Sequence, residues 1–142
     1  MAKLINTTQH IGDDPWHLVG DEQSLDAYAI ISLSRWQQQR DELLAQAKQG
    51  QLGILLNSDE TADQLAQDAE LFALICVNFP KFSDGRGYST ARLLRQHYSY
   101  KGELQACGDV LIDQLFYMRR CGFSRFALRD DQDIQDALTA FS

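Results

Sequence analysis

The sequence has few of the residues on which disulfide-stabilised and metal-stabilised domains depend. It contains three cysteines, an odd number without any CxxC spacing, so neither a disulfide framework nor a structural zinc site is indicated. The three histidines are scattered over dissimilar segments, and we expect no metal site. Buried thiols are the expectation for Cys76, Cys107 and Cys121. For Cys107, at the end of a predicted strand, a reactive thiolate activated by the following helix is the alternative.

Long hydrophobic runs are also missing. No apolar stretch approaches the roughly 18 residues of a membrane-spanning helix. The first ten residues, MAKLINTTQH, lack the basic and then apolar pattern of a secretion signal, so we expect a cytoplasmic protein without membrane contact. With 142 residues, of which 44% are hydrophobic, the chain is long enough to form one globular core without a metal or a disulfide.

Charge is acidic in total but unevenly distributed. The net charge is −7, yet residues 81–129, the basic window, hold nine Lys and Arg against four Asp and Glu, a balance of +5 that leaves −12 elsewhere. A solvated face is the usual reason for such a run, but this window contains a glycine-rich stretch, which favours an anionic ligand or an acidic partner. A pI of about 4.8 argues against a nucleic-acid partner.

Short apolar runs alternate with stretches of helical spacing from residue 27 onward. Residues 1–26 hold turn-forming residues around a few apolar positions and are expected to form a short hairpin or an irregular arm. Five strands that alternate with five helices predict one α/β domain over residues 27–142. An open, mostly parallel sheet with helices on both faces is the first arrangement, and a β/α half-barrel is the alternative, because the same alternation builds either. The expected strands are AYAIIS (27–32), LGILLN (52–57), LICVNF (74–79), ELQACG (103–108) and FSRFAL (123–128).

The helices between these strands have recognisable ends. Gly50 is a left-handed stop for the first helix, and Gly122 is one for the fourth. The second helix is expected to begin near Asp59, where negative charge favours a helix start. Its buried face, at helical spacing, is expected to hold Leu65, Ala69 and Phe72.

In α/β sheets, ligands bind at the carboxyl ends of the strands. Four polar stretches follow predicted strands there and are expected to converge: Asn57 to Asp59, the loop at 81–89 that contains DGRGYS, Gly108 with Asp109, and Arg129 with Asp130. The two glycines of DGRGYS let a ligand approach the backbone, the amides of residues 87–89 open a helix, and Arg86 can add a bidentate guanidinium. The candidate anion-binding residues are therefore Asn57, Asp84, Gly85, Arg86, Gly87, Tyr88, Ser89 and Asp109.

A structural turn is the alternative interpretation of DGRGYS. Asp84 would then cap the turn, both glycines would adopt positive φ, and Arg86 would pair with Asp84 or Asp109. Asp109 is itself suited to capping the next helix, where its carboxylate is held ionised. The spacing is not that of a P-loop, GxxxxGK[ST], and spacing alone assembles no catalytic triad, so we assign no catalytic residue.

Arg92 and Arg95 lie three residues apart on the helix after DGRGYS and therefore share a face of that helix. They are either simply solvated, or they extend the basic window towards an acidic patch of a partner protein. On the second interpretation they are the candidate partner-binding residues.

Two longer blocks connect the chain to a known family. FPKFSDGRGYSTARLLR (79–95) and GELQACGDVLIDQLFYMRRCGF (102–123) resemble the bacterial family called domain of unknown function 934, and the resemblance covers roughly residues 27–129. The family pattern usually has arginine where this chain has Gln105, and valine or isoleucine where it has Cys107. Members are often labelled probable oxidoreductases of sulfite reduction, because their genes lie beside those of sulfite reductase.

The resemblance implies an accessory protein of assimilatory sulfite reduction, which acts as an interaction or electron-delivery partner of a sulfite reductase component. The alternative is a small oxidoreductase or anion-binding enzyme that holds sulfite, sulfate or phosphate at DGRGYS. The sequence has neither a GxGxxG fingerprint nor the cysteine spacing of an iron–sulfur cluster. We therefore predict no cofactor, and we expect the electron chemistry to belong to another protein.

Overall fold

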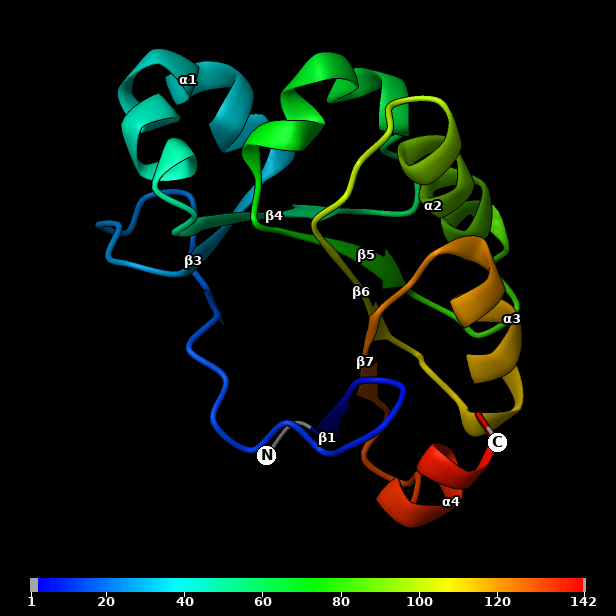
Figure 1. Ribbon diagram of the computed structural model, residues 1–142. Helices are drawn as coiled ribbons and strands as arrows, with labels where there is room; N and C mark the ends of the chain where they lie inside the picture. Colours follow the sequence, from blue (N-terminus) through cyan, green and yellow to red (C-terminus); the bar gives the residue numbers. More distant parts are fainter. Residues whose placement is uncertain (1–2, 142) are drawn as a thin grey trace.

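The structure is a computed structural model, and it describes residues 3–141. Seven strands form one sheet: β1 Lys3–Ile5, β2 His17–Leu18, β3 Ala29–Ser32, β4 Leu52–Leu56, β5 Leu74–Phe79, β6 Glu103–Gly108 and β7 Arg125–Leu128. Their order across the sheet is β1-β7-β6-β5-β4-β3-β2 (Figure 1). Neighbours from β2 to β7 are parallel, and β1 pairs with β7 antiparallel.

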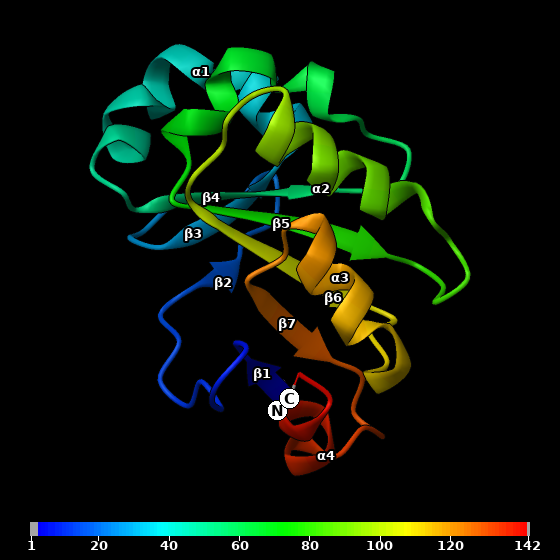
Figure 2. The ribbon, with the colours of Figure 1, turned by 45° about the vertical axis from the view of Figure 1, so that its right-hand side comes forward.

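The sheet curls into a half-barrel with all its helices on the convex side (Figures 1 and 2). Because strand order from β2 to β7 never reverses, each right-handed crossover returns the chain to the same face. The predicted α/β class and mostly parallel sheet are confirmed, and the half-barrel is the arrangement found, so helices cover one face instead of two. The helices are α1 Leu33–Lys48, η1 Ala62–Gln64, η2 Ala66–Leu71, α2 Arg86–Gln96, η3 Ile112–Gln114, α3 Leu115–Cys121 and α4 Ile134–Thr139.

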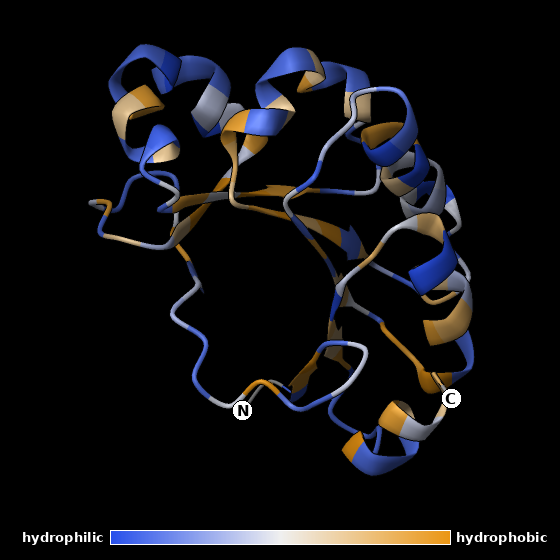
Figure 3. Cartoon of the chain, viewed as in Figure 1, coloured by the Kyte–Doolittle hydropathy of each residue, from blue (hydrophilic) through white to orange (hydrophobic). Residues whose placement is uncertain are grey.

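The main core lies between the convex face of the sheet and the helices. The strands are mainly apolar, with hydrophilic stretches in β5 and β6, whereas the helices are apolar on their inner sides and hydrophilic outside (Figure 3). The expected strands at 74–79 and 103–108 coincide with β5 and β6 residue by residue. The largest fully buried side chains include Trp36, Phe79, Phe126 and Leu94.

The N-terminal residues cover the concave side. β1 pairs with one edge of the sheet and β2 with the other, so residues 6–16 run along the open side of the curl, in blue in Figure 1. Trp16 packs there against a small cluster of Ile30, Leu74 and Cys76. The chain therefore links the two edges of the half-barrel across its own concave face.

The second predicted helix is wrong in type. In place of an α-helix, the structure has the two short 3-10 helices η1 and η2. Ala66, where η2 begins, has φ 49°, a left-handed conformation that an α-helix cannot continue through. The predicted buried face is nevertheless correct, because Leu65, Ala69 and Phe72 are all buried. The glycine stops at Gly50 and Gly122 are also confirmed, with φ values of 75° and 119°.

Gly108 occupies a position at the end of β6 that excludes a side chain. Its φ is 90°, and a Cβ there would overlap the carbonyl oxygen of Phe79 and lie 2.5 Å from Asn78 Oδ1. We predict that Gly108→Ala lowers the free energy of unfolding by about 2–4 kcal/mol, through backbone strain and overlap. Urea denaturation followed by circular dichroism measures this.

Gly12→Ala is the matched control, because a Cβ at Gly12 would meet nothing within 4 Å. It should change the free energy of unfolding by less than about 0.5 kcal/mol. Equal effects of the two substitutions would contradict this account of Gly108.

Candidate functional site

The loops that follow strands β4 to β7 meet at the carboxyl edge of the sheet, as expected. Arg86 Nη2 donates to Ser58 Oγ at 2.9 Å, which joins the loop after β4 to the start of α2. The amide of Phe82, in the loop after β5, donates to Asp109 Oδ2 at 2.8 Å. Asp109 Oδ1 in turn accepts from Arg129 Nη1, beyond β7, at 2.9 Å.

Arg86 has a carboxylate partner within its own loop. Its Nε and Nη2 donate to the two oxygens of Asp84 at 3.0 and 2.7 Å, and the Arg86 amide also donates to Asp84 at 3.1 Å. Arg86 lowers the pKa of Asp84 to about 2, and Asp84 raises the pKa of Arg86. An anion that binds Arg86 must therefore compete with an ionised carboxylate.

The two glycines of DGRGYS have different surroundings, and neither has positive φ. Gly85 has φ −86° and ample space, so the positive φ expected in the structural-turn interpretation is wrong. Gly87 lies in the first turn of α2, where a Cβ would come within 2.7 Å of the Phe79 ring. Gly87 thus permits α2 to pack closely on β5. Tyr88 lies between Phe79 and Tyr117, with ring centroids 5.1 and 4.9 Å away, as a half-buried aromatic of the core rim.

A pocket of about 320 Å³ lies beside Arg86, between the loop after β4 and the first turns of α2. Of the predicted residues, Arg86 and Ser89 line it, whereas Asn57 precedes the pocket residue Ser58 along the chain. Hydroxyl groups dominate its polar lining. The lining residues are Ser58, Asp59, Thr61, Arg86, Ser89, Thr90 and Leu93.

Asp109 joins loops instead of capping a helix. The next helix begins three residues later, at Ile112, and both carboxylate oxygens of Asp109 are engaged by Phe82 and Arg129. The hydrogen bond from the Phe82 amide is the main reason that the pKa of Asp109 is lowered, with Arg129 second. Arg129 also pairs with Asp131 at 2.7 Å. This set of bonds fixes the loop that presents the exposed Phe82 side chain.

The two candidate partner-binding arginines have different environments. Arg95 is half-buried, and its guanidinium donates to the carbonyls of Gly122, Tyr100 and Gly102 at 2.8–3.0 Å. Burial lowers its pKa. Arg92 is exposed, lies 5.2 Å from the centre of the Tyr117 ring and donates to the Tyr117 hydroxyl. Arg95 therefore ties α2 to the ends of other elements, while Arg92 faces solvent.

Arg92 belongs to an exposed surface across α2 and α3 that we call the aromatic–arginine surface: Arg92, Phe116, Tyr117, Arg119 and Arg120. Phe116 is 55% exposed and Tyr117 44% exposed, and the Arg120 guanidinium lies 6.0 Å from the Phe116 ring centre. Among residues 3–141, its arginines have no acidic partner. Sequence reasoning missed the two aromatics, although their place opposite the buried Leu115 and Met118 of α3 was the available signal.

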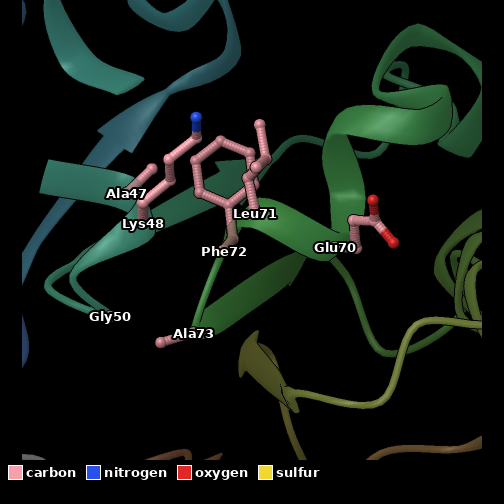
Figure 4. Close-up of a pocket in the computed structure, with 7 residues that line it drawn as sticks. All are labelled: Ala47, Lys48, Gly50, Glu70, Leu71, Phe72 and Ala73. Atoms are coloured by element: carbon pink, nitrogen blue, oxygen red, sulfur yellow. The ribbon is translucent and has the colours of Figure 1, made fainter. Parts of the chain in front are cut away.

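A larger hollow, of about 420 Å³, lies beside the amino ends of β4 and β5, and Figure 4 shows the residues that line it. It forms between the end of α1 and η2, away from the carboxyl ends of the strands. Figure 4 shows the charged ends of Lys48 and Glu70 well apart, so no polar groups converge there. It is therefore a weaker candidate than the carboxyl edge.

The three thiols are sheltered, in line with the expectation of buried cysteines. Cys76 and Cys121 are buried, and Cys107 is partly buried with Sγ donating to the Val77 carbonyl at 3.6 Å. Burial raises the pKa of Cys107 to about 11 and that of Cys76 well above its usual range. Within residues 3–141, His, Cys, Asp and Glu side chains form no group of three or more suited to a metal ion.

Comparison with protein families matches residues 53–142 to a family described as "Bacterial protein of unknown function (DUF934)". The chain belongs to this family. The matched region runs from β4 to the end of the chain and contains both the DGRGYS stretch and the aromatic–arginine surface. No curated protein matches the chain significantly. Within residues 3–141 of this protein, no helix is long and apolar enough to cross a membrane.

The sheltered thiols predict slow thiol chemistry. At pH 8, folded protein should react with a disulfide reagent such as DTNB at least about 100-fold more slowly than the denatured protein. All three thiols are sheltered, and burial also raises the pKa of Cys76 and Cys107. After denaturation, three thiols per chain should react with the reagent, one for each cysteine. A fast stoichiometric reaction of one thiol in the folded protein, lost in Cys107→Ser, would contradict this and restore the reactive-thiolate alternative.

Proposed function

We propose that this protein is an accessory protein of assimilatory sulfite reduction, which uses its aromatic–arginine surface to dock on an acidic surface of a sulfite reductase component. Docking would make it an interaction or electron-delivery partner of that enzyme. The sulfite-reduction part rests on the sequence resemblance. The docking part rests on the aromatic–arginine surface.

The composition of this surface supports a protein partner. Tyr, Phe and Arg are enriched at protein interfaces, and Tyr and Arg in particular provide much of the binding energy there. Arg92 lies over Tyr117 and Arg120 over Phe116, so the side chains are ordered before a partner arrives. Less rotamer freedom is then lost on binding.

The charge distribution supports an acidic partner in particular. The chain as a whole carries −7, so a positive surface on α2 and α3 gives the molecule a strong charge asymmetry. An acidic partner is attracted to this surface and repelled by the rest, which orients the encounter. Arg86, Arg125 and Arg129 contribute less, because each is paired with a carboxylate of its own chain.

Charge reversal at Arg92 and Arg120 tests the docking proposal. The affinity of the purified protein for the sulfite reductase haemoprotein of the same organism is measured by calorimetry at 50 and 300 mM NaCl. Wild-type protein should bind more weakly at the higher salt, and Arg92→Glu/Arg120→Glu should weaken binding at 50 mM by at least about tenfold, or 1.4 kcal/mol. Arg95 is left unchanged because its carbonyl contacts stabilise the fold.

Lys101→Glu is the matched control. Lys101 is exposed just before β6, at the amino end of that strand, outside the aromatic–arginine surface. One such reversal should leave the affinity within about twofold of wild type, and circular dichroism should show that all variants are folded. An equal loss of affinity in Lys101→Glu and in Arg92→Glu/Arg120→Glu would refute the docking proposal. Absence of binding at both salt concentrations would also refute it.

A second candidate function is supported by the pocket beside Arg86. Its hydroxyl groups and one guanidinium suit a small anion such as sulfite, sulfate or phosphate, held as a ligand or substrate of a small enzyme. Such an anion competes with Asp84 for Arg86 and is opposed by the Asp59 carboxylate in the lining. Each anion at 10 mM should raise the melting temperature above that in NaCl of equal ionic strength, and Arg86→Ala should remove the effect. Ser89→Ala should reduce it. An unchanged shift in Arg86→Ala would exclude this pocket.

A further inference from the structure

Arg125 and Gln105 form a polar pair on the concave face of the sheet. They lie in register on neighbouring strands, and Gln105 is also in register with Cys76 on β5. Side chains alternate along each strand, and Phe126, next to Arg125, belongs to the convex core. Arg125 is 8% exposed and Gln105 9% exposed, so both polar groups are removed from water.

Two atoms of this pair lack partners in the described chain. Arg125 Nη2 donates to Asp14 Oδ1 at 2.7 Å, but Arg125 Nε has no acceptor and Gln105 Oε1 has no donor. A buried polar atom without a hydrogen-bond partner destabilises the folded state, so two of them on adjacent strands call for an explanation. What is missing is a group that accepts a hydrogen bond from a cation and donates one to an amide oxygen.

We propose that the concave face binds a small oxyanion that carries an O–H group, as hydrogen phosphate does. Its oxygens accept from Nε and Nη2 of Arg125, and its hydroxyl donates to Gln105 Oε1. The planar guanidinium presents two parallel N–H groups that match an oxyanion. The site uses neither the aromatic–arginine surface nor the pocket beside Arg86, and it stands independently of the proposed function.

Asp14 acts at this site as an internal carboxylate that occupies the guanidinium when no ligand is bound. It belongs to residues 6–16, the segment that crosses the open side of the half-barrel. Its side chain is 22% exposed, so it can turn towards water when an anion takes its place on Arg125. Binding to the wild-type protein is therefore a competition between the ligand and the Asp14 carboxylate.

The other neighbours of Arg125 suit an anion. Cys76 and Cys107 line the same face, and burial keeps both thiols protonated at neutral pH by raising their pKa. Trp16 and Leu74 provide an apolar surround in which the attraction between a guanidinium and an anion is stronger than in water. Asp14 is the carboxylate bound to Arg125, and removing its charge is the direct test.

Asp14→Asn preserves the size of the side chain and removes its charge. Calorimetric titration of this variant with inorganic phosphate at pH 8, at constant ionic strength, should give at least about tenfold tighter binding than wild type. Sulfate has a similar size and charge but no O–H at this pH. It should bind the same variant at least about fivefold more weakly than phosphate.

Further variants identify the side chains that bind phosphate. In the Asp14→Asn background, Arg125→Gln should abolish phosphate binding, and Gln105→Met should erase the preference for phosphate over sulfate. Arg86→Ala, at the carboxyl edge, should leave phosphate binding unchanged and serves as the control for the other pocket. Circular dichroism establishes that each variant is folded, and the Gln105 result stands even where Arg125→Gln does not fold.

Three outcomes would overturn the proposal. Absence of phosphate binding to Asp14→Asn would mean that the two unpartnered atoms are satisfied by water. Equal affinity for phosphate and sulfate would remove the role of Gln105. Loss of phosphate binding in Arg86→Ala but not in Arg125→Gln would place the anion at the carboxyl edge. None of these outcomes bears on docking to sulfite reductase, which uses Arg92 and Arg120.

Discussion

Strands β2 to β7 keep their chain order around the sheet, and this order determines how the helices, the polar loops and the N-terminal residues are arranged. Because right-handed crossovers then return each helix to one side, the helices cover the convex face and the polar loops gather at one edge. Within residues 3–141, the concave face receives no helix. The N-terminal residues cover it instead, since β1 and β2 pair with opposite edges and residues 6–16 cross between them.

The arginines illustrate how one type of side chain acquires several roles in this fold. Arg95 donates hydrogen bonds to three backbone carbonyls and thereby stabilises the packing of α2. Arg86 is neutralised by a carboxylate of its own loop. Arg125 is buried and pairs with Asp14 of residues 6–16, the segment that crosses the open side of the half-barrel. Within the described chain, only the aromatic–arginine surface has arginines, such as Arg92, that lie beside exposed aromatics and lack an acidic partner. The positive charge available to a protein partner is therefore smaller, and more local, than the basic window indicates.

Two internal carboxylates hold arginines in contrasting settings. Asp84 lies two residues from Arg86, whose side chain is 60% exposed, so salt screens this pair. Asp14 reaches Arg125, whose side chain is only 9% exposed, across 111 positions of sequence. The first pair orders a local turn. The second joins residues 6–16 to the sheet. The same contact therefore closes the half-barrel and keeps a guanidinium at the proposed anion site.

Local patterns in the sequence were enough to predict the apolar strands, the glycine stop at Gly122 and the gathering of polar loops at the carboxyl edge. Tertiary structure alone decided strand order, and with it the half-barrel, because both arrangements share one local pattern. It also decided the 3-10 break at Ala66 and the contacts of Arg95 and Arg125. The partners of these two arginines lie up to 111 residues away, and no periodicity along a chain encodes such distances.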